Sequence, residues 1–151
     1  MKKKKKLLVL LAILLICPVA MHSQKSVDQI FKEFSKEKGV MRVDIGKFTM
    51  TIAGLFTDVM GVNGVEVYTF EECNQSVKER INTAISSMKD AKYETLVSVN
   101  EDRERTKILV KTDGETLSEL IVLTSGTEPA LIRIKGKIKP SDIENVIKQN
   151  K

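Results

Sequence analysis

The chain has 151 residues, of which 25 are lysine or arginine and 20 are aspartate or glutamate, giving a formal net charge of +5. It contains one histidine and two cysteines. A chain of this length makes one domain of ordinary size, with a core large enough to be stable without disulfides. The two counts exclude sites that need several histidines or a framework of paired cysteines.

The first 23 residues have the pattern of a secretory signal peptide. Lysines occupy positions 2–6, and positions 7–16 form an unbroken apolar run that is too short for a finished transmembrane helix. We expect cleavage after Ala20 or Ser23, with Ser23 preferred and Gln24 as the new N-terminus. The predicted location is the periplasm or the cell envelope, with no transmembrane segment after cleavage.

Cys17 allows a second interpretation, because a lipoprotein signal carries an acylated cysteine directly after its apolar run. The residue before it is Ile16, where that pathway requires a small residue. Ordinary cleavage is therefore favoured over a lipid anchor at Cys17.

Removal of the signal segment changes the charge and the chemistry of the chain. It takes five of the 25 basic residues and none of the 20 acidic ones, so that 20 of each remain. His22 and Cys17 leave with it, and Cys73 is then the one thiol. A neutral domain lacks the basic surface of a nucleic-acid binder, and without histidine it has no Ser-His-Asp or Cys-His pair and no imidazole ligand. We expect no catalytic, metal or cofactor site and no nucleic-acid partner.

The chain after residue 24 begins with a helix signal over 26–39. Ser26 is the expected N-cap, Gln29 its capping-box partner and Gly39 the C-terminal stop. Residues 40–45 alternate enough to predict a short strand.

The next segment carries no charge between Lys47 and Asp58. A helix that is apolar nearly all round is typically buried, which makes a central core helix one interpretation. The alternative is an apolar surface for a partner protein, a lipid or a membrane, in which methionines supply adaptability. The sequence leaves both open for the residues concerned, Phe48, Met50, Ile52, Leu55, Phe56, Val59 and Met60.

Further elements follow in order. Residues 62–64 (Val-Asn-Gly) indicate a turn and residues 65–70 a strand, and Asn74 is the expected cap of a helix that ends near residue 89. The period then changes to two, which predicts four strands over 93–100, 105–112, 117–124 and 130–138. Asp113-Gly114 indicates a tight hairpin, and Ser141 with Glu144 indicates a short C-terminal helix.

This order of elements predicts a single α+β domain over residues 24–151. We expect a mainly antiparallel sheet with a C-terminal four-strand meander, and helices packed on one face of it.

Basic residues occupy every second position of the last predicted strand, which places four positive charges on one face. The simplest interpretation is a solvated face or an edge guarded by lysines, and the alternative is a site for an anionic ligand or a lipid headgroup. The isoleucines at 132, 134 and 138 should then point inward. The possible basic strand face consists of Arg133, Lys135, Lys137 and Lys139.

Two other groups of residues invite a chemical interpretation. Cys73 precedes a predicted helix N-terminus, where the dipole lowers a thiol pKa, but with no histidine as base we interpret it as a small buried cysteine. Glu71, Glu72 and the acidic residues at 101–104 lack the spacing of a calcium loop. We interpret them as solvated turns.

Three stretches resemble one family of exported bacterial proteins. They are VDQIFKEFSKEKGV, GVNGVEVYTFEE and, above all, DGETLSELIVLTSGTEPALIRIKGKIKPSDIENV. The chain is similar over nearly all of its mature length to the family, common in Bacteroidota, catalogued as domain of unknown function 4252. The resemblance implies export and a cell-envelope setting near surface sensing or stress signalling, and it transfers no site residue.

Three functions remain for such a domain. The first is a non-enzymatic binding or interaction module for an envelope protein or an apolar ligand. The second is an accessory of envelope stress or surface signalling. The third is a histidine-independent hydrolase with two converging carboxylates, drawn from Glu71, Glu72 or Glu94.

Overall fold

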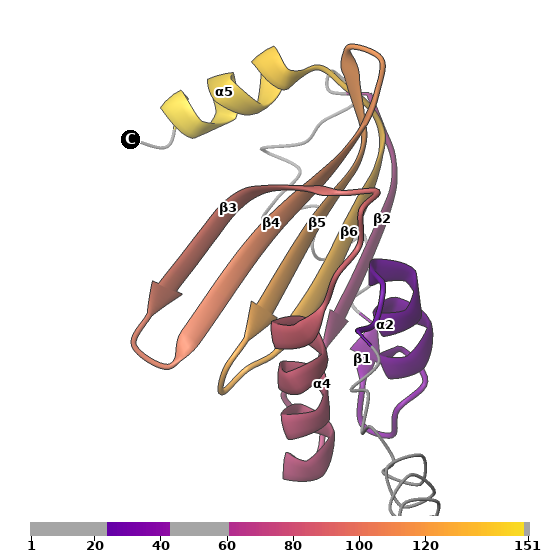
Figure 1. Cartoon of the computed structure of the whole chain (residues 1–151), viewed down its shortest axis with the longest axis vertical. Helices are drawn as coiled ribbons and strands as arrows, with labels where there is room; N and C mark the ends of the chain where they lie inside the picture. Colours follow the sequence, from indigo (N-terminus) through magenta and orange to yellow (C-terminus); the bar gives the residue numbers. More distant parts are fainter. Residues whose placement is uncertain (1–23, 43–60, 150–151) are drawn as a thin grey trace, which may run out of the picture.

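The computed structural model describes residues 24–42 and 61–149, with side chains up to Glu144. Six strands form one antiparallel sheet in the order β1-β2-β6-β5-β4-β3 (Figure 1). The α+β class and the mainly antiparallel sheet are thereby confirmed. The strands are β1 (Met41–Arg42), β2 (Val62–Thr69), β3 (Glu94–Glu101), β4 (Glu104–Asp113), β5 (Thr116–Ser125) and β6 (Ala130–Ile138); the helices are α2 (Val27–Phe34), α4 (Gln75–Ser87) and α5 (Pro140–Gln149).

Helix α2 begins at the predicted capping box. The backbone N–H of Gln29 donates to Ser26 Oγ at 3.3 Å, and the backbone N–H of Ser26 donates to Gln29 Oε1 at 2.9 Å. The helix ends at Phe34, earlier than the predicted stop at Gly39. Gly39 has φ +90°, and a Cβ there would lie 2.8 Å from the carbonyl oxygen of Glu72. Glycine is therefore required at position 39, where the loop passes close to the turn before α4.

Helix α4 has the predicted N-cap and one buried face. Asn74 Oδ1 accepts from the backbone N–H of Val77 at 3.0 Å. At the other end the ammonium of Lys107 donates to the carbonyl of Ile85 at 3.3 Å, which satisfies one of the carbonyls that a helix leaves without a partner. Val77, Ile81, Ala84 and Ile85 are buried against the sheet and α2.

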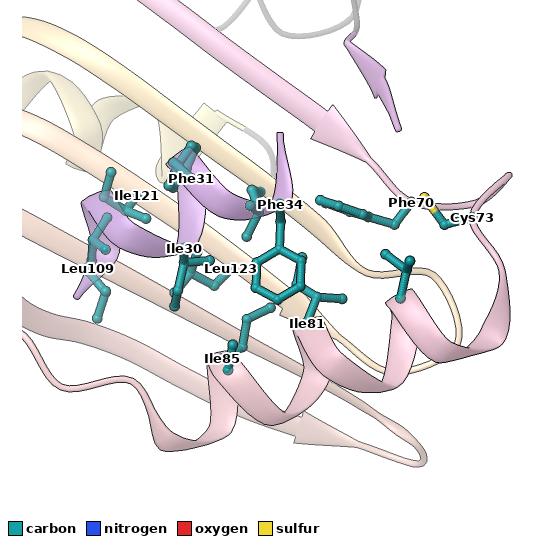
Figure 2. Packing of buried hydrophobic residues seen from close by; sticks show 14 residues of the cluster. Ile30, Phe31, Phe34, Phe70, Cys73, Ile81, Ile85, Leu109, Ile121 and Leu123 are labelled. Carbon is teal, nitrogen blue, oxygen red and sulfur yellow. The ribbon is translucent and has the colours of Figure 1, made fainter. Parts of the chain in front are cut away.

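The first core cluster lies between these two helices and one face of the sheet (Figure 2). Phe34 of α2 meets Phe70 edge to face, with ring centroids 6.4 Å apart, and Phe31 meets Tyr68 in the same way at 6.1 Å. The sheet contributes side chains that alternate along three neighbouring strands, Leu109, Ile121, Leu123 and Leu131. This layer holds the largest fully buried side chains of the described fold.

A second cluster occupies the other face of the sheet. Its buried members are Val110, Leu117, Leu120, Ile134 and Ile138, and Ile143 of α5 packs against them. The prediction that the helices share one face therefore holds for α2 and α4 and is wrong for α5. In Figure 1, α5 lies at the opposite end of the sheet from α4. Of the three isoleucines expected to point inward, Ile134 and Ile138 are buried and Ile132 is half-buried against this cluster.

The predicted turn at residues 62–64 is wrong, because these residues begin β2. The register against β6 shifts between Val62 and Gly64, which makes Asn63 the extra residue of a bulge. The carbonyl of Gly61 accepts from the backbone N–H of Lys137 at 2.9 Å, and a Cβ on Gly136 would collide with that carbonyl oxygen. The glycines at 61 and 136 let the backbone before β2 and the backbone of β6 approach closely here.

The four strands of the second half follow one another both in the chain and in the sheet. The hairpin between β4 and β5 is confirmed, with Asp113 paired to Thr116 and Gly114 in the first loop position at φ +62°. Positive φ at that position is what a tight primed turn requires.

Removal of one side chain tests whether α4 is bound to the sheet through this core. Ile81 is fully buried between α4, α2 and the sheet, so Ile81→Ala should lower the free energy of unfolding by about 2–5 kcal/mol. Thr83→Ala, at an exposed position of the same helix, should change it by no more than about 0.5 kcal/mol. Urea unfolding followed by circular dichroism measures both, and equal small losses would contradict the assignment.

Candidate functional site

The apolar segment from Phe48 to Met60 lies outside the described residues. Whether Phe48, Ile52, Phe56 and their neighbours form core or interface is therefore still a prediction. The predicted signal segment, residues 1–23 with Cys17, also lies outside the described residues, and the remaining candidates fall within them.

The possible basic strand face is not continuous. Lys135, Lys137 and Lys139 are exposed, but the expectation of four solvated charges is wrong for Arg133, which is 8% exposed. Its neighbours on the sheet are Glu66 of β2 and Ile121 of β5, so it lies on the face that carries α2. Because both faces of the sheet are covered at this part of β6, side chains that point to either face are buried.

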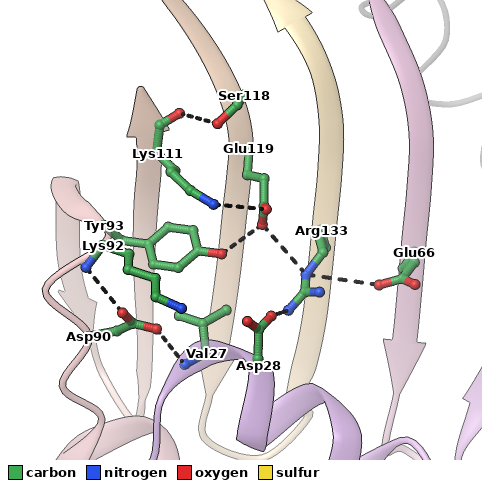
Figure 3. A network of polar contacts seen from close by, with 10 residues as sticks. All are labelled: Val27, Asp28, Glu66, Asp90, Lys92, Tyr93, Lys111, Ser118, Glu119 and Arg133. Atoms are coloured by element: carbon green, nitrogen blue, oxygen red, sulfur yellow. Dashed lines mark hydrogen bonds and ion pairs between the residues drawn. The ribbon is translucent and has the colours of Figure 1, made fainter. Parts of the chain in front are cut away.

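Arg133 is the centre of a polar network under α2 (Figure 3). Its Nη2 donates to Asp28 Oδ1 of α2 at 2.7 Å. Its Nε lies 3.9 Å from Glu66 Oε2 and 3.9 Å from Glu119 Oε2, too far for a hydrogen bond to either. The guanidinium also covers the ring of Phe31, with Cζ 4.2 Å from the centroid.

Glu119 joins the network to β4 and to the start of β3. Tyr93 donates its hydroxyl to Glu119 Oε2 at 2.6 Å, and Lys111 Nζ lies 3.7 Å from Glu119 Oε1. Burial first, and then the hydrogen bond to Glu119, raises the pKa of the Tyr93 hydroxyl above its ordinary value of 10. The hydroxyl is therefore a permanent donor at neutral pH.

These contacts make Arg133 a structural residue. Its charge compensates three carboxylates on two strands and one helix, and Asp28 fixes the first turn of α2 to the sheet. The neighbouring contact from Val27 N–H to Asp90 Oδ2, at 3.1 Å, fixes the same turn to the loop before β3. A buried guanidinium already paired in this way offers no charge to an anionic ligand.

Cys73 is a buried free thiol, as predicted, with 7% of its surface exposed. Burial raises the pKa of the thiol, although the Lys78 ammonium opposes this effect. The dipole of α4 therefore does not activate it, because a thiol with a raised pKa carries little thiolate at neutral pH.

The carboxylates considered for hydrolysis do not converge with the buried network. Glu71 and Glu72 are exposed in the turn before α4, and Glu94 is exposed at the start of β3. Two open clefts occur in the described part of the chain. One, of about 390 Å³, lies between α4 and the two neighbouring hairpin turns, and the other, of about 610 Å³, lies along α2. None of these three glutamates lines either cleft.

The first cleft has one well-fixed side chain, Asn82 of α4. Its Nδ2 donates to the carbonyl of Gly126 at 2.9 Å, and its Oδ1 accepts from the backbone N–H of Gly126 at 3.0 Å. Gly126 has φ +140°, and a Cβ there would lie 2.7 Å from the carbonyl oxygen of Arg103. The pair of hydrogen bonds holds α4 to the turn between β5 and β6 and fixes the orientation of the Asn82 amide.

Three exposed apolar side chains lie on β3, at one edge of the sheet, where the sequence pattern predicts a strand but no surface. All eight residues of β3 are exposed, and its Leu96, Val97 and Val99 are 54%, 37% and 42% exposed. Val97 is paired with Ile108, a residue of the second cluster, and Val99 with Thr106. Because paired residues share a face, the two valines extend the sheet face that α2 and α4 leave free. We call this strand with its three apolar side chains the β3 edge.

Two structural findings bear on metals and membranes. In the ranges 24–42 and 61–149, no three His, Cys, Asp or Glu side chains are grouped so that they could hold a metal ion. Within the same ranges, no helix combines the length and the apolar character needed to cross a bilayer.

Comparison with known proteins gives one match. The sequence model described as domain of unknown function, DUF4252, matches residues 33–146. No curated protein and no solved structure is significantly similar to the chain. The matched range includes every strand of the sheet and ends within α5.

Replacement of Arg133 tests its structural role. Arg133→Met keeps the stem over Phe31 but removes the charge, and we expect a loss of about 2–3 kcal/mol in the free energy of unfolding. Breaking a fully buried pair typically costs about 3–5 kcal/mol, and the loss is smaller here because Asp28 is largely exposed. The double variant Arg133→Met with Glu119→Gln should recover part of it. Lys135→Met, at an exposed position of the same strand, is the matched control.

The raised pKa of Tyr93 predicts that the free energy of unfolding declines at alkaline pH. The raised pKa of its hydroxyl means that the unfolded chain ionises first, so its contribution is complete below about pH 10 and is lost as the pH rises further. Wild type should therefore lose stability faster than Tyr93→Phe between about pH 9 and pH 11, measured by urea titrations. Identical slopes for wild type and Tyr93→Phe would refute the role of the hydroxyl.

Proposed function

The chain belongs to the DUF4252 family over most of its length, and we propose that it is an exported, non-enzymatic interaction module of the cell envelope. The observation that supports this function is the β3 edge. Exposed apolar side chains that continue an apolar sheet face are typical of surfaces that bind another protein.

Export is proposed from the first 23 residues. The lysines at 2–6 and the apolar run at 7–16 support a signal peptide cut near Ser23, and Ile16 before Cys17 supports ordinary cleavage over a lipid anchor. The mature domain then carries no net charge and no histidine. Its partner would be an envelope protein or an apolar ligand.

The chemistry of the described side chains supports binding over catalysis. The part-buried polar side chains have structural partners: Tyr93 is bound to Glu119, Lys107 to the carbonyl of Ile85, and Arg133 to Asp28. Burial lowers the pKa of the Lys107 ammonium, but its contact with α4 already gives that amine a role. A two-carboxylate hydrolase would need acids that converge in a cleft, and no such arrangement of Glu71, Glu72 and Glu94 supports it. A role in envelope signalling would be one use of the same binding surface.

The proposed function predicts both a location and a surface. A tagged full-length chain should be recovered from the periplasm or envelope fraction with Gln24 at its N-terminus. A photo-crosslinking residue placed at Val99 should join the protein to a partner in the cell, whereas the same residue at exposed Lys36, in the turn that follows α2, should not.

The matched variants separate surface from fold. Val97→Asp with Val99→Asp should abolish the crosslink formed from Leu96, and Ser98→Asp, which adds a charge to the same strand on the helix-bearing face, should keep it. Recovery in the cytosol, or crosslinks that do not depend on Val97 and Val99, would overturn the proposal.

A further inference from the structure

β3 is the last strand of the sheet that the described residues form. β4 pairs with one side of β3, and no strand in the described part of the chain pairs with the other. The opposite edge of the sheet differs, because the short strand β1 pairs with part of β2 there. An open edge presents backbone N–H and C=O groups that can pair with another strand.

β3 lacks the features with which soluble proteins commonly block such an edge. Residues 95–100 contain no lysine, no proline and no charge, and the strand is eight residues long. One guard is present: the register shifts between Thr95 and Val97, so Leu96 is the extra residue of a bulge. From Val97 to Glu101 the pairing with β4 is regular, which leaves this stretch suited to accept a strand.

The charges at the ends of β3 indicate what kind of strand fits. Glu94 and Glu101 stand at the two ends, and Glu101 is paired directly with Glu104 across the hairpin. Like charges placed opposite each other are unfavourable. The nearby cations lie outside the strand: Lys92 precedes it by two residues, Arg103 is in the turn, and Arg105 of β4 donates from Nε to Asn100 Oδ1 at 2.7 Å.

A second copy of the chain is a poor occupant on these grounds. Antiparallel pairing over the whole strand would set Glu94 of one copy against Glu101 of the other. Parallel pairing would set each glutamate against its own counterpart. A segment with basic residues at both ends avoids this repulsion in either direction.

We infer that the β3 edge binds an extended segment of another protein in which apolar residues alternate and lysine or arginine flanks them on both sides. The segment adds to the sheet as a strand beside Val97–Glu101, its apolar residues continue the face of Val97 and Val99, and its basic ends lie near Glu94 and Glu101. This inference rests on the proposed function and specifies the partner and the mode of binding.

Two synthetic peptides test the chemistry. Both alternate valine and threonine; one carries two lysines at each end and the other two glutamates. The lysine-flanked peptide should bind the mature protein about tenfold more tightly at low salt, as two exposed attractive pairs replace two repulsive ones. Fluorescence anisotropy measures the affinities. Hydrogen exchange should show new protection of the amides of β3 and not of β6.

Charge reversal provides the matched variant. Glu94→Lys with Glu101→Lys, both at exposed positions, should invert the preference, so that the glutamate-flanked peptide binds about tenfold more tightly. Glu71→Lys with Glu72→Lys, an equal change of charge away from β3, should keep the wild-type preference. Equal binding of the two peptides, no binding of either, or dimers that need β3 in sedimentation experiments would each overturn the inference.

The failure of this inference can be told from failure of the proposed function. If crosslinks from Val99 to a cellular partner persist while the peptides show no preference, the surface is right and the strand chemistry is wrong. If no such crosslink forms, both are wrong.

Discussion

The arrangement of this fold depends on the burial of α2 and α4 against one face of the sheet. Phe34, Ile81 and Ile85 fill the space between the two helices and the strands, and each helix begins at a local cap that fixes where it starts. Because both helices lie on that face, the residues that point to it must be apolar or paired. Arg133 is the clearest case, since its position under α2 is tolerable only with Asp28, Glu66 and Glu119 around it.

The same placement determines what the other face can do. It has its own apolar cluster, against which Ile143 of α5 packs. At the edge of the sheet, one side of β3 is not paired with any strand of the described residues. The polar network around Arg133 lies within the helix-bearing layer, whereas three exposed apolar side chains, Leu96, Val97 and Val99, lie on β3 and a fourth, Met41, lies on β1. Under the proposed function, binding and stability depend on different regions of one sheet, so a change on the β3 edge should leave the helix-bearing core intact.

Much of the fold was predictable because its signals are local. The caps at Ser26 and Asn74, the hairpin at Asp113-Gly114 and the alternation in β4 to β6 depend on residues within a few positions of one another. The errors occurred where a distant contact decides the outcome. Residues 62–64 resemble a turn but continue β2 because β6 pairs with them, and α2 stops at Phe34 although the favourable pattern runs on to Gly39.

The site was harder to predict for the same reason. Alternating basic residues in β6 suggested one solvated face, and nothing adjacent to Arg133 showed that α2 would cover it. A signal did exist in β5, where Glu119 interrupts an apolar run and therefore needed a buried cation as partner. The openness of β3 could not be read from its sequence, because a strand is an edge only in relation to the order of the whole sheet.

The contact between Asn82 and Gly126 has a mechanical consequence. The amide of Asn82 offers one N–H and one C=O to the backbone of Gly126, which is the pair of bonds that a neighbouring strand residue would offer. In this respect α4 extends the hydrogen bonding of the sheet past the end of β5. A force applied to the turn between β5 and β6 therefore has a path into α4 through these two hydrogen bonds as well as along the strands.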